Sequence, residues 1–257
     1  MRQIPLALSA AEPPSFDNYV AGSNGEAVAV LRALAGEREA APARDAAPAR
    51  RAVYLWGEPG AGKTHLLDAL AASVGARAIR LGPESPAEAF SGALDRLSRA
   101  AAAPPADVSA PPAGAASPIV IVDDCDRLDD ARQQAVFHLF NRVGEIPGAA
   151  FAAAGAQPPL ALALRDELRT RLGWGVVLRL ALLTDDEKAD ALRRAAQGRG
   201  IALPEELIRW LLTHRSRDIR WLLRLLDALD RYALERKRAI TLPLLREFEN
   251  AEPLVKS

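Results

Sequence analysis

Cysteine, lysine and long uncharged segments are scarce in this 257-residue sequence. It has one cysteine, Cys125, which excludes an internal disulfide or a cysteine-rich zinc site and is typical of a reducing compartment such as the cytoplasm. The N-terminus lacks the charged-then-apolar pattern of a signal peptide. The longest uncharged run, residues 146–164, is interrupted by prolines and glycines, so it predicts a strand and a turn instead of a membrane-spanning helix.

The formal net charge of the sequence is zero, because 33 basic residues balance 33 acidic ones. This argues against nucleic-acid binding through the overall field of the chain, although a local basic patch stays open. Only four of the basic residues are lysines, and the excess of arginine is read mainly as a genome-composition effect. An individual arginine therefore needs positional evidence before it is given a role.

Short apolar strands alternate with helical patterns over the first two thirds of the chain. The strand candidates are residues 52–56, 76–81, 119–122, 149–154 and 176–180, and the helix candidates are residues 24–38, 63–73, 86–99 and 130–143. This alternation predicts a parallel sheet covered by helices on both faces. Two Ala/Pro-rich stretches, residues 40–50 and 101–118, predict loops.

The composition changes after about Thr184 and is helical from there on. The helix candidates are residues 185–198, 204–214, 217–236 and 241–250. Thr184 with Glu187 forms a capping-box pattern, and Ser216 is a second N-cap candidate. We therefore expect a flexible tail over residues 1–15, an α/β domain over 16–183 and a small helical domain over 184–257.

The strongest motif is the run of residues 57–64, GEPGAGKT, which matches the P-loop pattern in full. Its glycines let backbone N–H groups converge on phosphate oxygens, and the following helix directs the positive end of its dipole to the same point. Lys63 can reach the β- and γ-phosphates, and the Thr64 hydroxyl would complete a Mg²⁺ shell. The predicted residues for ADP or ATP are Gly57, Pro59, Gly60, Ala61, Gly62, Lys63 and Thr64.

The apolar strand candidate at residues 119–122 ends on two aspartates. Asp123 would hold Mg²⁺, usually through a water, and Asp124 could orient or polarise the attacking water, so both are candidate catalytic residues. The alternative is that the pair only caps the next helix. Cys125 beside them is read as a half-buried small apolar residue. His65 is either a phosphate contact or a solvent-facing helix residue.

These motifs together resemble an AAA+ ATPase of the DnaA branch. Residues 16–24, FDNYVAGSN, resemble the segment of that branch that lies along the adenine, which adds Tyr19 and Val20 to the nucleotide site. Residues 171–175, RLGWG, resemble its arginine-finger segment, and residues 217–220, RDIR, resemble its second sensor. The resemblance implies a parallel five-stranded AAA+ sheet flanked by helices and followed by a small all-helical lid.

The resemblance also implies roles for two arginines. Arg171 would reach across a subunit boundary to the γ-phosphate held by a neighbour, whereas Arg217 would contact the phosphates of its own chain. The alternative for Arg171 is a surface residue paired with Asp166 or Glu167, and Arg169 is a weaker candidate for the finger.

The sequence departs from the family after the strand candidate at residues 149–154. The family usually places a polar residue there that senses the γ-phosphate, but residues 152–157 read AAAGAQ. Only weak hydrolysis by this chain alone is therefore expected, whereas nucleotide binding does not require that residue.

The N-terminal tail carries a short motif of its own. Residues 3–8, QIPLAL, resemble the peptide by which replication proteins dock on the β sliding clamp of DNA polymerase III. Gln3 offers an amide for hydrogen bonding, and Leu6 and Leu8 offer apolar side chains; the alternative is a frayed terminus. After the last helix candidate only seven residues follow, so the helix-turn-helix domain of full-length initiators is not expected and DNA contact would be indirect.

This combination is similar to the Hda family of regulatory inactivators, which act with the DNA-loaded clamp to promote hydrolysis of ATP on DnaA. The resemblance implies that Arg171 enters the ATP site of the initiator, with ADP or ATP as a structural switch on this chain. A cytoplasmic protein without a membrane anchor is expected, and a homo-oligomer stays open. Two alternatives are a stand-alone DnaA-like ATPase, acting as a helicase loader or initiator-like factor, and an adaptor that does not use its finger.

Overall fold

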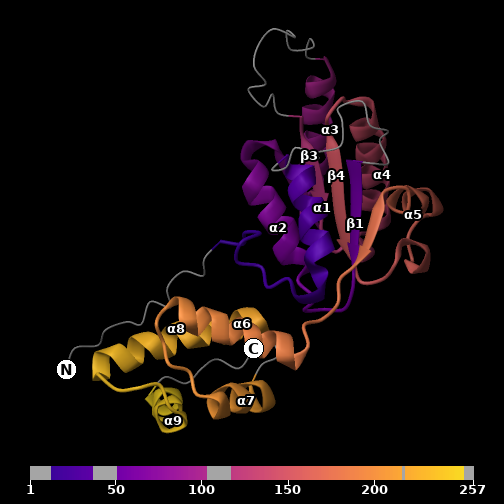
Figure 1. Ribbon diagram of the computed structural model, residues 1–257. Helices are drawn as coiled ribbons and strands as arrows, with labels where there is room; N and C mark the ends of the chain where they lie inside the picture. Colours follow the sequence, from indigo (N-terminus) through magenta and orange to yellow (C-terminus); the bar gives the residue numbers. More distant parts are fainter. Residues whose placement is uncertain (1–12, 37–50, 103–116, 216–217, 252–257) are drawn as a thin grey trace. The chain divides into compact units, whose positions relative to one another are not determined.

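The computed structural model describes residues 13–36, 51–102, 117–215 and 218–251 (Figure 1). Residues 14–182 form one compact unit, the core unit, and residues 183–251 belong to a second, the helical unit. Each is described by itself.

The core unit is built on a parallel five-stranded sheet with the strand order β2-β3-β4-β1-β5. The strands are β1 (Ala52–Trp56), β2 (Ala78–Leu81), β3 (Ile119–Val122), β4 (Ala150–Gly155) and β5 (Val176–Arg179). Both faces of β3 and β4 are buried, which explains why these strands are uninterrupted runs of apolar residues and glycine. The predicted five-stranded parallel sheet is confirmed.

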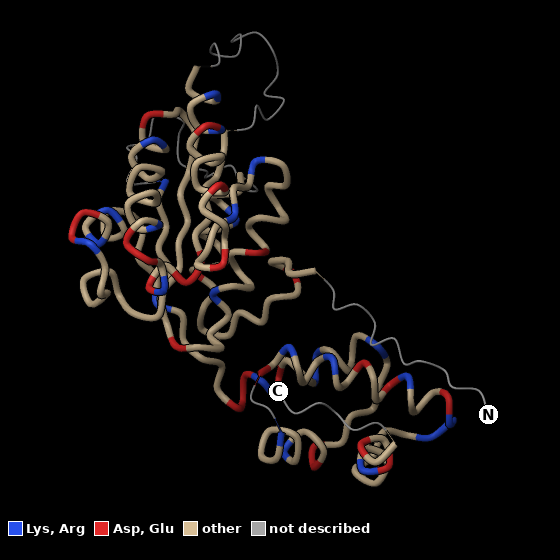
Figure 2. Tube along the Cα trace, turned by 180° about the vertical axis from the view of Figure 1, so that it is seen from behind, with Lys and Arg blue, Asp and Glu red and all other residues tan. Residues whose placement is uncertain are grey.

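Helices cover both faces of this sheet (Figure 1). On one face lie α1 (Gly25–Ala35) and α2 (Lys63–Val74); on the other lie α3 (Ala87–Ala102), α4 (Asp130–Glu145) and α5 (Asp166–Leu172). Alternate residues of each strand supply the two apolar cores: Val53 and Leu55 of β1 pack with α1 and α2, and Tyr54 packs with the other three helices. Figure 2 shows charged residues on the helices and beyond the strand ends, with few on the strands themselves.

Helix bounds in the core unit differ from the sequence-based expectation by up to three residues, and one helix was not predicted; α3 runs on to Ala102, into the stretch predicted to be a loop. Helix α1 ends at Ala35 instead of residue 38, because Gly36 adopts the left-handed backbone conformation and its N–H bonds back to the last turn. Helix α5 was not predicted, since its seven residues are too few for a periodic pattern. It carries acidic residues in its first turn and Arg169 and Arg171 in its last, as the helix dipole favours.

The helical unit contains α6 (Asp185–Gly198), α7 (Glu205–His214), α8 (Ile219–Arg236) and α9 (Leu242–Ala251). Its core is mostly leucine, with an edge-on contact between the rings of Tyr232 and Phe248. The predicted helices are confirmed, but the start of α8 is not: it begins at Ile219 and its N-cap is Asp218, whose side chain accepts a hydrogen bond from the Arg220 N–H. The predicted N-cap, Ser216, is therefore wrong, and it lies outside the described residues.

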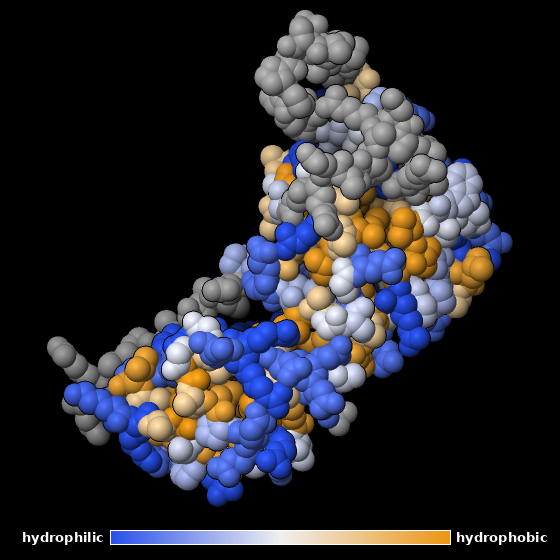
Figure 3. Space-filling view, in the orientation of Figure 1, coloured by the Kyte–Doolittle hydropathy of each residue, from blue (hydrophilic) through white to orange (hydrophobic). Residues whose placement is uncertain are grey.

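The surface of the helical unit is largely hydrophilic on the face seen in Figure 3, with smaller apolar areas between the charged side chains. Its four helices are amphipathic and direct most of their leucines into the unit's own core, although Leu234 of α8 is exposed. Over the described parts of both units, no helix is long and apolar enough to cross a bilayer.

The predicted capping box at the start of α6 is confirmed. The Thr184 hydroxyl accepts a hydrogen bond from the Glu187 N–H at 3.2 Å, and the Glu187 carboxylate accepts one from the Thr184 N–H at 2.8 Å. Thr184→Ala is expected to lower the free energy of unfolding by about 1 kcal/mol, because it leaves a helix N–H without its partner. Urea unfolding followed by circular dichroism measures this loss. Thr184→Ser keeps the oxygen and serves as the control; equal losses in both variants would contradict the capping role.

Candidate functional site

The P-loop connects the end of β1 to the start of α2, and its conformation requires glycine at two close approaches. Gly57 lies against the backbone of Leu180, so a Cβ atom there would collide with the Leu180 carbonyl oxygen. Gly62 has φ 90°, and a Cβ atom there would lie 2.6 Å from the ring of Tyr19. The loop backbone is thus packed between the segment after β5 and the N-terminal segment.

Lys63, the first residue of α2, folds back over the loop. Its Nζ atom donates hydrogen bonds to the carbonyl oxygens of Gly57 at 2.7 Å and Glu58 at 3.1 Å. The neighbouring Thr64 is exposed. The ammonium group and a hydroxyl therefore lie at the start of one helix, where its dipole favours an anion.

The N-terminal segment reaches the P-loop through Tyr19 and Asn24. The Tyr19 hydroxyl donates to the Ala61 carbonyl at 3.2 Å and accepts a hydrogen bond from the Asn24 side chain at 3.3 Å. The Asn24 amide also exchanges two hydrogen bonds with the backbone of Ala181, at 2.9 and 2.8 Å. Burial raises the pKa of Tyr19, although the Asn24 hydrogen bond lowers it, so the phenol is a neutral donor near pH 7.

Asn24 was not selected as a site residue from the sequence, where it only began a helix candidate and ended the segment FDNYVAGSN. Its side chain is almost fully buried, and because it bonds both to Tyr19 and to the chain after β5 it organises this side of the loop. Val20, the other residue predicted to lie along the adenine, is half-buried in the same segment.

His65 is buried, so the expectation of a solvent-facing residue is wrong. Its Nε2 atom lies 3.0 Å from the Ser15 carbonyl oxygen, and its ring lies 5.4 Å from that of Tyr19. These contacts hold the N-terminal segment against α2. A contact between His65 and a phosphate stays a prediction.

Asp123 follows the last residue of β3 and is 8% exposed. One of its carboxylate oxygens accepts a hydrogen bond from the Arg80 guanidinium at 2.9 Å, and the other accepts one from the Asp124 N–H at 3.0 Å. Each oxygen keeps a second lone pair, so this carboxylate retains acceptor capacity for a hydrated Mg²⁺. Arg80 was missed from the sequence; the available signal was a single charge in the otherwise apolar strand AIRL.

Asp124 adopts a left-handed backbone conformation, with φ 44°, which is uncommon for a residue other than glycine. Its carboxylate lies 3.4 Å from the Arg127 guanidinium and is partly exposed. Helix α4 is capped by Asp129, which accepts from the Arg132 N–H, and Asp124 makes no side-chain cap at the short 3-10 turn that follows it. The alternative that the Asp123–Asp124 pair serves as a helix cap is therefore wrong.

The end of β4 is packed by Tyr54 of β1. Its hydroxyl donates to the Gln157 carbonyl at 2.8 Å and would collide with a Cβ atom at Gly155. Cys125 is fully buried beside it, not half-buried as expected, and burial raises the pKa of its thiol to about 12, so it is a neutral thiol. Within the described chain, Gln157 is the only polar side chain among residues 152–157, and it is exposed.

Arg171, in the last turn of α5, is held by two aromatic rings and an amide. Its Nε atom donates to the Asn141 side-chain oxygen at 3.0 Å, and its guanidinium carbon lies 3.8 Å from the ring centroid of Trp174 and 5.7 Å from that of Phe137. Over the parts of the chain that the structure describes, no carboxylate forms an ion pair with it.

The two acidic neighbours that the sequence offered to Arg171 are paired elsewhere. Asp166 pairs with Arg169 at 2.6 Å, and Glu167 lies 3.9 Å from Arg165. The alternative that Arg171 is tied to Asp166 or Glu167 is therefore wrong. Arg169, the weaker finger candidate, is therefore paired with a carboxylate of its own helix, α5.

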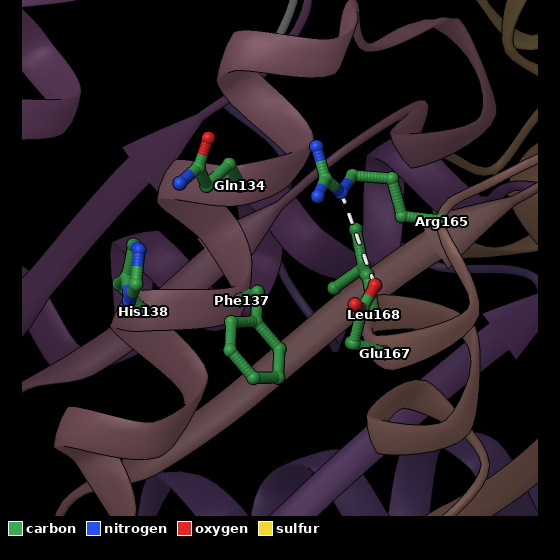
Figure 4. A pocket seen from close by; sticks show the side chains of 6 residues that line it. All are labelled: Gln134, Phe137, His138, Arg165, Glu167 and Leu168. Atoms are coloured by element: carbon green, nitrogen blue, oxygen red, sulfur yellow. Dashed lines mark ion pairs between the residues drawn. The ribbon is translucent and has the colours of Figure 1, made fainter.

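Phe137 links Arg171 to a hollow of about 220 Å³ between α4 and α5. Figure 4 shows its ring projecting between His138 and the Arg165–Glu167 ion pair. The hollow is lined by Gln134, Phe137, His138, Arg165, Glu167 and Leu168. Trp174, the other ring in contact with Arg171, is 52% exposed, so apolar and cationic groups share this surface of the core unit.

Four predicted site residues lie outside the described residues and stay predictions: Gln3, Leu6, Leu8 and Arg217. Just before the last of them, Arg215 of the helical unit forms a two-pronged ion pair with Glu249, at 2.8 and 2.6 Å.

Two family models match the chain. The family described as "ATPase family associated with various cellular activities (AAA)" matches residues 53–148, which contain the P-loop and the two aspartates. The family described as "Hda, lid domain" matches residues 185–248, from the start of α6 into α9 of the helical unit.

Solved structures of DnaA and RuvB share the fold. Domain III of the Thermotoga maritima initiation protein DnaA is 19% identical, with a TM-score of 0.58 over 90% of this chain and 93% of that one. DnaA from Aquifex aeolicus, solved with AMPPCP bound, is 20% identical, with a TM-score of 0.60 over 87% and 68%. A RuvB mutant from T. maritima is 17% identical, with a TM-score of 0.61 over 94% and 74%.

These findings agree with the geometry of the two units. The core unit has the AAA+ sheet and P-loop, and the helical unit is a lid of the Hda type. The chain is therefore an Hda-like AAA+ protein that shares the fold of the replication initiator DnaA.

Proposed function

We propose that this chain is a negative regulator of replication initiation that binds the sliding clamp and promotes hydrolysis of ATP held by DnaA. The Hda lid and the DnaA-like core support a DnaA-related replication regulator. Gln3, Leu6 and Leu8 are the proposed clamp contacts. In this proposal the protein acts in the cytoplasm, and it meets DNA only through its partners.

The observation that carries the proposal is the setting of Arg171. Stacking on Trp174 and the hydrogen bond to Asn141 restrict the guanidinium to one region, which lowers the entropy lost when it pairs with a phosphate. Within the described chain no carboxylate neutralises it, so its charge is available to a partner. A pre-positioned, unneutralised arginine on the surface is what a finger acting on a neighbour's γ-phosphate requires.

The nucleotide of this chain is proposed to be a structural switch. The P-loop and Tyr19 would hold ADP or ATP, and Thr64 and Asp123 would hold Mg²⁺, which neutralises phosphate charge when bound. Arg217 is proposed to contact the same phosphates. Asp124 could orient a water, but the buried end of β4 offers no polar side chain for the γ-phosphate at Ala154 or Gly155. Intrinsic hydrolysis is therefore expected to be weak.

Reconstitution tests the function directly. DnaA carrying labelled ATP is mixed with clamp loaded on DNA and with this protein, and the label on DnaA is followed over time. The protein is expected to shorten the lifetime of DnaA-bound ATP, and Gln3→Ala is expected to weaken this effect about tenfold by removing the clamp's hydrogen-bonding partner.

Gln197→Ala is the matched control, because it removes an exposed glutamine from α6. An unchanged lifetime of DnaA-bound ATP in the presence of the wild-type protein would refute the proposed function. The helicase-loader alternative instead predicts rapid ATP turnover by the isolated protein.

A further inference from the structure

Arg80 and Asp123 project from the same face of the sheet. In β2, Ile79 and Leu81 belong to the core formed with α3 and α4, so Arg80 between them faces α2. In β3, Ile121 packs on the α2 side, and Asp123 follows it by two residues. The strand register pairs Arg80 with Ile121, which brings the two charged side chains together next to the P-loop helix.

Arg80 bridges two carboxylates. Its Nη2 atom lies 2.9 Å from an oxygen of Asp123 and 2.9 Å from an oxygen of Asp68, and its Nε atom donates to Asp68 at 3.0 Å. Asp68 lies four residues after Thr64, one turn further along α2. The guanidinium therefore connects the carboxylate proposed for Mg²⁺ to the helix that begins in the P-loop.

The position of this cation changes the electrostatics of the site. A largely buried Asp123 without a counter-charge would repel the phosphates of a bound nucleotide, and Mg²⁺ relieves that repulsion in a P-loop site. Here a covalently attached positive charge already lies within hydrogen-bonding distance of the carboxylate. It lowers the repulsion without metal, and its own charge opposes the approach of Mg²⁺ to the same oxygen.

We propose that Arg80 is a specificity-determining residue that takes over part of the role of Mg²⁺ as the counter-charge of Asp123. The P-loop then binds ADP almost equally well with and without the metal. This inference rests on the proposed nucleotide binding at the P-loop and adds the metal requirement to it.

The test is a titration of the full chain with fluorescently labelled ADP, once with Mg²⁺ and once with EDTA. The ratio of the two dissociation constants is expected to stay within about threefold for the wild type. In Arg80→Gln it is expected to rise to about tenfold or more, because Asp123 then lacks its charged hydrogen-bond donor and depends on the metal. The readout is binding and does not require turnover.

Three variants separate this role from a purely structural one. Arg77→Gln removes a nearby arginine that donates to the Ala35 carbonyl, and its ratio is expected to match the wild type. Asp68→Asn removes one of the two carboxylates that pair with Arg80, so Arg80 then pairs with Asp123 alone. The ratio of dissociation constants for this variant is expected to equal or fall below the wild-type value. Arg80→Lys keeps the charge and is expected to restore most of the metal independence, which keeps the test valid if Arg80→Gln folds poorly.

Several outcomes would overturn the inference. One is a strong Mg²⁺ requirement in the wild type that is unchanged in Arg80→Gln. Another is that Arg80→Gln and Asp68→Asn shift the ratio of the two dissociation constants in the same direction and to the same extent. If labelled ADP binds in neither buffer, the proposed nucleotide function itself fails, and this inference fails with it.

Discussion

Arg171→Ala should abolish the stimulation of ATP hydrolysis on DnaA while leaving the protein folded and able to bind the clamp. An arginine finger is worth about 10³-fold or more in rate, because its guanidinium neutralises charge that develops on the transferred phosphoryl group. The measurement is the decay of DnaA-bound ATP in the reconstituted system, with the variant in place of the wild type. Clamp binding and the affinity of this chain for ADP are expected to stay unchanged.

The surroundings of Arg171 provide matched variants. Arg169→Ala removes an arginine two residues away that pairs with Asp166, and it should leave the stimulation near the wild-type level. Arg171→Lys keeps the charge but loses the planar fork, so most of the stimulation should be lost. Trp174→Ala should cause a smaller loss, since the guanidinium loses the ring on which it stacks. Full stimulation by Arg171→Ala would refute the finger and favour an adaptor.

Lys63→Ala is expected to weaken the binding of ADP by about 100-fold. The ammonium lies over the P-loop, bonded to the carbonyls of Gly57 and Glu58, and its charge is the main side-chain attraction for the β-phosphate at this point. Loss of a charge-assisted contact in a partly buried site costs up to about 3 kcal/mol, which corresponds to that change in affinity. Titration with fluorescently labelled ADP measures it.

Lys237→Ala, at an exposed lysine that follows α8, is the control for this experiment. It should bind ADP as the wild type does. Thermal unfolding without nucleotide should give similar midpoints for both variants and the wild type. Wild-type affinity in Lys63→Ala would refute nucleotide binding at the P-loop.

The fold could be predicted where one physical signal dominates. The strand at residues 119–122 is buried on both faces, so its sequence is purely β-branched and its bounds were predicted to the residue. Helix α5 was missed because seven residues give no measurable period, and its charges favour its ends without identifying it. Serine and aspartate are both good N-cap residues, so the sequence alone could not decide between Ser216 and Asp218 at the start of α8. The structure shows that Asp218 is the cap.

The candidate site shows a similar division. The P-loop and Asp123 were found because each is a local pattern that its chemistry fixes: glycines before a helix, and an acid after a buried strand. Arg80, Asn24 and Asn141 were not found, because each acts through a partner distant in sequence: Asp123, Ala181 and Arg171 respectively. Their roles depend on strand order and helix packing, which no single segment encodes.

The packing around Gly155 has a consequence for how this protein can change by mutation. Any side chain at that position meets the Tyr54 hydroxyl, and the Asp126 carboxylate lies 3.0 Å from where its Cβ would be. A polar group can be introduced there only if Tyr54 is also replaced, and replacing Tyr54 alone removes its hydrogen bond to Gln157 and opens a cavity in the core. Placing a polar residue at this position therefore requires two substitutions that are each harmful alone. Positions 54 and 155 are therefore coupled, and the effects of substitutions at them are not expected to add.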